Sequence, residues 1–146
     1  MKDAADALRA EVQQTATLLL SLSDDAVAGP RGAGKWSRKE VLGHLIDSAV
    51  NNHQRFVRAQ FTNPFVWPGY EQDAWVSVHR YRDRPWRELV DVWASLNAHL
   101  AHVIEHVPAD RLSTECRIGS ADPATLEWLI RDYLRHLRHH LGQIVG

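Results

Sequence analysis

The sequence has little of what marks several protein classes. Its single cysteine, Cys116, excludes an internal disulfide and fits a reducing cytoplasm. It contains no run of roughly 18 or more apolar residues, so we expect no membrane-spanning segment. The opening residues, MKDAADALRAEVQQ, carry acids early and no continuous apolar stretch, unlike a secretory signal. These absences together predict a cytoplasmic protein that makes no contact with membranes.

A charge excess of either sign is also missing. The 17 basic and 18 acidic residues give a net charge of −1, so no basic field would attract nucleic acid. The arginine-rich stretch HRYRDRPWRE is interrupted by acids and is better explained as a solvated helix start. We find no internal repeat and no low-complexity segment, and 146 residues suit one domain, 1–146, with a single core.

Apolar residues recur with helical spacing in four segments and nowhere show a sustained strand pattern. The fold prediction is therefore all-α, a four-helix bundle. In the second segment Ser37 and Glu40 have the spacing of a capping box. The predicted helices are Ala4–Leu22, Ser37–Ala59, Pro85–Pro108 and Ala124–Ile144.

A long loop joins the second and third predicted helices and contains the stretch NPFVWPGYEQDAW. Loops of this length are uncommon in small domains and are often functional. We expect it to hold a short helical turn and expect substrate to enter near Phe61–Ala74. A further loop is predicted over about Ala109–Pro123.

Nine histidines and six tryptophans stand out in so short a chain. The last predicted helix carries HLRHH, in which His136 and His140 share a face, His140 inside the apolar stripe and His136 at its border, while His139 points elsewhere. Two imidazoles four residues apart on a helix can chelate one divalent cation. Leu137 follows the first of them, so the glutamate base of an HExxH protease is missing.

A catalytic zinc-like site requires three protein ligands and one open position. His44, at the edge of the apolar face of the second helix, is the best third candidate. The ridge formed by His99, His102 and His106 is interpreted as mostly exposed, and His53 and His79 fall near loops. The alternative stays open that the His136 and His140 pair is structural or an accident of the surface.

The remaining unusual residues have ordinary explanations. The tryptophans are interpreted as anchors of the core and loops rather than as a substrate cage. Cys116 is interpreted as an incidental loop thiol, because nothing near it in the sequence suggests a depressed pKa.

Two fragments together resemble the DinB-like (DinB/YfiT-like) family of metalloenzymes. KWSRKEVLGHLIDSAVNNHQRF has the family's Trp-Ser start, His-Leu-x-Asp core and trailing arginine. DYLRHLRHHLGQI has its His-x3-His pair and Gly-Gln-Ile ending. The resemblance implies a four-helix bundle with a non-sequential packing order, often a homodimer, and a divalent metal held by His44, His136 and His140. In the same motifs Asp47 and Gln143 could support the metal ligands, although solvation at the helix surface explains Asp47 equally well.

Three neutral imidazoles suit zinc or nickel, and also iron, copper, cobalt or manganese. The resemblance further implies thiol S-transfer, isomerisation or hydrolysis of a small-molecule substrate, with a low-molecular-weight thiol or water as the nucleophile. Asp47 and His139 are the candidates for a general base. Two alternatives are kept: a metal-binding or stress-response bundle without turnover, and a plain bundle without metal.

Overall fold

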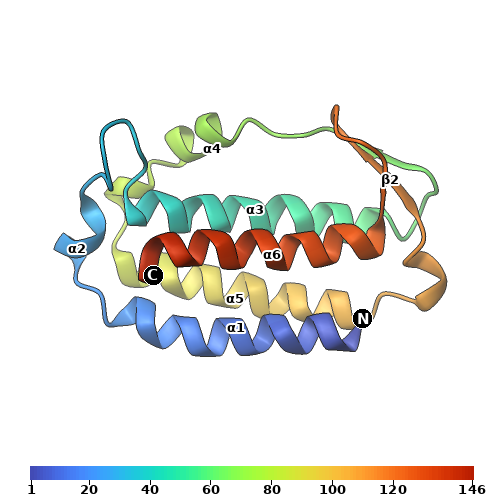
Figure 1. Cartoon of the computed structure of the whole chain (residues 1–146), viewed down its shortest axis with the longest axis horizontal. Helices are drawn as coiled ribbons and strands as arrows, with labels where there is room; N and C mark the ends of the chain where they lie inside the picture. The colour runs from blue at the N-terminus through green and yellow to red at the C-terminus, as the bar shows by residue number, and fades with distance from the viewer.

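Four long α-helices dominate the computed structural model, which describes all residues from 1 to 146 (Figure 1). Their ends differ from the predicted ones by only a few residues, so the four predicted helices are confirmed. None of them combines the length and apolarity needed to span a bilayer. They are α1 (Lys2–Leu20), α3 (Arg38–Arg58), α5 (Trp86–Glu105) and α6 (Leu126–Val145).

The helices do not pack in the order of the chain. Both α1 and α3 pack against α5 and α6, so helices that follow one another in sequence are not always neighbours in the bundle. Figure 1 shows α3 and α6 running side by side. This order matters for the site, because it brings the second and last long helices into direct contact.

The expectation of a purely helical chain is wrong in one respect. Three short strands, β1 (Phe65–Trp67), β2 (Glu115–Ile118) and β3 (Ala124–Thr125), form a small sheet in the order β1-β2-β3. The strand β1 pairs with β2 in parallel, and β3 pairs with β2 antiparallel. Strands of two to four residues are too short to display the alternation that reveals a strand in sequence. The sheet ties the two long connections together at one end of the bundle.

The connections also contain short helices. The first, α2 (Asp24–Ala28), lies in the connection between α1 and α3. The second, α4 (Gln72–His79), is the predicted helical turn of the long loop, and the 3₁₀ turn η1 (Tyr81–Asp83) follows it. Figure 1 shows α4 lying outside α3, on the outer surface of the bundle. A further 3₁₀ turn, η2 (Ala109–Arg111), follows α5.

The core is one continuous cluster of 31 buried apolar residues, to which all four long helices contribute. Trp86 and Trp93 are buried in it, as expected for core anchors. Trp128 departs from that expectation, because 54% of it is exposed near the start of α6. Cys116 lies buried in β2 rather than in a loop, and burial raises the pKa of its thiol to about 11, so it is not a ready nucleophile.

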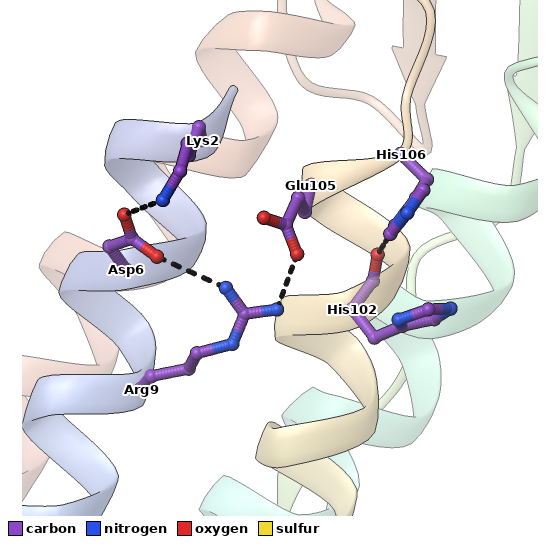
Figure 2. A network of polar contacts seen from close by, with 6 residues as sticks. All are labelled: Lys2, Asp6, Arg9, His102, Glu105 and His106. Carbon is purple, nitrogen blue, oxygen red and sulfur yellow. Dashed lines mark hydrogen bonds and ion pairs between the residues drawn. The ribbon is translucent and has the colours of Figure 1, made fainter.

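Polar contacts at helix ends fix the helices in place. At the start of α3, the Ser37 hydroxyl accepts a hydrogen bond from the Glu40 amide and the Glu40 carboxylate accepts one from the Ser37 amide, which confirms the capping box. Between α1 and α5, Arg9 donates to Asp6 at 3.1 Å and to Glu105 at 2.6 Å (Figure 2). Such partly exposed pairs orient helices more than they stabilise them.

Figure 2 also shows two exposed histidines of the α5 end, His102 and His106. The ring of His106 hydrogen-bonds through Nδ1 to the backbone carbonyl of His102 at 2.8 Å. His99, His102 and His106 are all exposed, as predicted, and none belongs to a group of three metal-ligating side chains.

Gly43 is required by the close approach of η1 to α3. A Cβ atom at this position would lie 2.1 Å from the Tyr81 ring, which is itself buried. Tyr81 therefore packs directly on the backbone of α3, one residue before His44.

We predict that Gly43→Ala destabilises the protein, because overpacking of this kind costs about 1–3 kcal/mol. Gly142→Ala is the matched control, since Gly142 is also helical but a Cβ atom there would have no neighbour within 4 Å. Its higher helix propensity should raise the stability by roughly 0.5–1 kcal/mol. Urea unfolding measures both, and a Gly43→Ala protein as stable as Gly142→Ala would contradict the close packing.

Candidate metal centre

Three histidines from two helices converge between α3 and α6. His44 on α3 is completely buried, deeper than the edge position expected from the helical wheel. His136 and His140 lie one turn apart on α6 and are partly buried. The Nε2 atom of His136 is 3.4 Å from that of His44 and 3.1 Å from that of His140. The three ligand atoms all lie within 4.8 Å of one another.

The two Nε2 separations at His136 match what a small tetrahedral cation needs. Nitrogen ligands about 2.0–2.1 Å from zinc at tetrahedral angles are roughly 3.3 Å apart. The two Nε2 separations fall within a few tenths of an ångström of that value. The residues present therefore fit a divalent metal ion, and they supply three ligands without a fourth histidine, cysteine or carboxylate in the group.

Burial keeps these imidazoles uncharged. Burial, with a smaller contribution from the neighbouring histidines, lowers the pKa of His44 to about 3 and that of His136 to about 4. Burial also lowers the pKa of His140. At neutral pH all three rings are neutral, so their lone pairs are available to a metal without prior loss of a proton.

Gln143 orients His140. Its Oε1 lies 2.8 Å from Nδ1 of His140, so Nδ1 carries the proton and donates, and the lone pair on Nε2 faces the other two imidazoles. Nδ1 of His44 has no hydrogen-bond partner. Packing holds that ring instead, with the Trp36 ring centroid 5.0 Å away.

Asp47 faces a different set of residues. Its Oδ1 accepts a hydrogen bond from the Tyr81 hydroxyl at 2.6 Å and lies 3.1 Å from Nδ1 of His79. Burial raises the pKa of Asp47, against the opposing effects of Tyr81 and His79. The carboxylate therefore joins η1 and α4 to α3, and it makes no hydrogen bond to His44, His136 or His140.

His139, the other candidate base, is exposed on α6. Its ring centroid is 5.1 Å from that of His140, but it does not belong to the three-histidine group. His53 lies within α3 rather than near a loop, with its ring 5.1 Å from His99. His79, expected near a loop, ends α4 beside Asp47.

A cavity of about 280 Å³ opens beside the centre and reaches His136. The long connection contributes Gly69, Tyr70 and Gln72 to its lining, and entry of substrate near Phe61–Ala74 stays a prediction. The polar residues that line the cavity could not be recognised in the sequence, because they come from three distant segments: α3, α6 and the connection. They include Ser48, Asn52, Arg55, Tyr70, Asp132 and Tyr133.

Comparison with known proteins identifies the family. The family model described as the DinB superfamily matches residues 7–144. A protein of Halalkalibacterium halodurans named "putative metal-dependent hydrolase" is 23% identical over 127 residues, covering 87% of this chain and 74% of the relative. One of the same name from Geobacillus thermodenitrificans is 26% identical over 151 residues, covering 100% and 79%.

A solved structure shares the fold. YfiT from Bacillus subtilis, described as "a probable metal-dependent hydrolase with an unusual four-helix bundle topology", superposes with a TM-score of 0.85 at 20% identity. The match covers 98% of this chain and 83% of YfiT. The fold, the packing order of the helices and the match over nearly the whole sequence lead to one conclusion: the chain belongs to the DinB superfamily.

Proposed function

We propose that this protein is a metal-dependent enzyme whose divalent cation is held by His44, His136 and His140. The observation that carries the proposal is the convergence of three neutral imidazoles, with Nε2 atoms 3.1 and 3.4 Å apart, from two helices distant in sequence. The name of the two relatives, "putative metal-dependent hydrolase", supports the same class. Zinc and nickel suit this nitrogen donor set best.

When bound, such a cation supplies Lewis acidity, which lowers the pKa of a water or thiol ligand or polarises a carbonyl. Hydrolysis of a small molecule agrees with the relatives' names, and transfer of a low-molecular-weight thiol is the second reaction that this chemistry permits. A metal that only fastens helices together would need no approach from solvent. The cavity that reaches His136 favours an enzyme instead.

Two side chains next to the proposed ligands, those of Gln143 and Asp132, would support the chemistry of the metal ion. Gln143 holds His140 in the tautomer whose Nε2 can donate its lone pair. Asp132 is the carboxylate that lines the same cavity as His136, and its charge opposes the lowering of the pKa of that histidine. We assign Asp132, rather than Asp47 or His139, the role of accepting a proton from the nucleophile.

The metal content of purified, untagged protein tests this proposal. After incubation with zinc or nickel, we expect about one ion per chain, and we expect His44→Ala, His136→Ala and His140→Ala each to lose it because three ligands are required. The control is His139→Ala, which removes a histidine from the same helix and should keep the ion. Mass spectrometry measures the content, and circular dichroism checks that each variant is folded.

A wild-type protein that stays free of metal under these conditions would refute the proposed function. Loss of the ion in His139→Ala to the same extent as in His136→Ala would refute the assigned ligand set. Zinc should also raise the melting temperature of the wild type and leave that of His136→Ala unchanged, because only the folded site binds the ion.

Gln143→Leu should weaken zinc binding by about 10–100-fold, because His140 loses the acceptor that fixes its tautomer. Asp47→Asn is the control: Asp47 also lies one turn from a proposed ligand but contacts Tyr81 and His79. Competition with a fluorescent zinc chelator gives both affinities. Equal affinities in Gln143→Leu and the wild type, or a larger loss in Asp47→Asn, would contradict the support assigned to Gln143.

A further inference from the structure

Arg55 is a half-buried cation without a counter-ion. It lies on α3 and lines the same cavity as His136. Its Nε atom is buried and has no hydrogen-bond partner, and no carboxylate forms an ion pair with its guanidinium. Cζ of Arg55 lies 5.9 Å from the ring centroid of Tyr70.

Arg58, one turn further along α3, shows the usual arrangement. It donates a hydrogen bond to Oε1 of Gln54 at 2.8 Å at the surface and lies over the Trp67 ring at 4.6 Å. These two arginines of α3 thus differ in their hydrogen bonding, since only Arg55 has a buried Nε without a polar partner.

The neighbours of Arg55 cannot neutralise it. Burial raises the pKa of the Tyr70 phenol, so that group is uncharged at neutral pH. Asp132, in the same cavity, already accepts a hydrogen bond from Arg135 at 2.9 Å. Ser48 and Asn52 carry no charge, and the Asn52 amide donates to the backbone of Ser48. Burial lowers the pKa of Arg55, but a guanidinium stays protonated.

A charge that loses part of its hydration without gaining a partner destabilises the folded protein, and its use is then to be sought in a ligand. The planar guanidinium matches a carboxylate, which it can bind through two parallel hydrogen bonds. We propose that Arg55 binds a carboxylate group of the small molecule on which the metal centre acts. This inference rests on the proposed function for the identity of the ligand as substrate.

The volume and the charge of the cavity limit the chemical class of the substrate further. The cavity volume of about 280 Å³ lies near the lower end of ligand pockets, so the substrate is small. The negative charge of Asp132 in the same cavity favours a group with a single charge, a carboxylate, over a doubly charged phosphate. The substrate class is therefore a small carboxylic acid whose reacting group lies at the His136 end of the cavity.

The test uses metal-free protein labelled with ¹⁵N, so that it does not depend on the metal. The Nε–Hε resonance of Arg55 is followed by NMR during titration with butyrate, with its uncharged isostere butyramide and with inorganic phosphate, at constant ionic strength. We expect saturable binding of butyrate that shifts this resonance, weaker binding of phosphate, and no effect of butyramide. Arg55→Met should bind butyrate at least roughly tenfold more weakly, and Arg58→Met should bind it like the wild type.

The proposal is overturned if butyrate and butyramide act alike, if phosphate binds as tightly as butyrate, or if Arg55→Met keeps the wild-type affinity. A structural role for Arg55 is tested separately by the melting temperature. Because Arg55→Met removes an unpaired, half-buried charge, we expect its melting temperature to rise by roughly 2–4 °C. A fall would identify Arg55 as a packing residue and would also overturn the proposal.

Repeating the titration after zinc loading separates the two proposals. If the wild-type protein takes up no zinc but butyrate still depends on Arg55, the proposed function fails and the carboxylate site stands. If zinc binds and butyrate shows no dependence on Arg55, the carboxylate site fails and the metal centre stands.

Discussion

Burial of three uncharged imidazoles between α3 and α6 is the constraint on which the rest of the site depends. Histidine is costly to bury without partners, and at this interface each ring meets another ring rather than a carboxylate. Nε2 of His136 belongs to both close pairs and carries either one proton or one lone pair, so one ordinary hydrogen bond at most can form among the three atoms. A divalent cation at their centre would satisfy all three at once.

The packing order of the bundle makes this arrangement possible. Because α1 and α3 both pack on α5 and α6, the second and last long helices touch although 92 residues separate His44 from His136. Around the histidines, Gln143 holds one ring by a hydrogen bond and Trp36 packs on another. The Tyr81 ring of η1 packs on Gly43, and its hydroxyl donates a hydrogen bond to Asp47. These two contacts hold the α4 segment on the outer face of α3.

The sequence predicts the helices well, because each is long enough for its apolar period to be unmistakable. The capping box at Ser37 and the shared face of His136 and His140 follow from local spacing alone. The small sheet could not be predicted in this way, since its longest strand has four residues and β1 pairs with a strand that lies beyond the whole of α5 in the sequence.

The surroundings of the site depend on contacts between distant segments, and there local spacing fails. Helical geometry puts Asp47 one turn from His44 but cannot say that Tyr81 and His79 lie against its carboxylate. Nor does it reveal that Arg55 is half-buried without a counter-ion, because that requires knowing which side chains the long connection brings over α3. His44 likewise is deeper than its position on the helix suggests, since Trp36 packs against it.

The central claim concerns the ligand set, and X-ray absorption at the metal edge of the zinc-loaded protein tests it most directly. The account predicts three imidazole nitrogens at about 2.0–2.1 Å and one further light atom that exchanges with added ligands. A fourth imidazole in place of the exchangeable atom would contradict an open catalytic position. A shell of oxygen atoms without imidazole scattering would contradict the three-histidine centre itself.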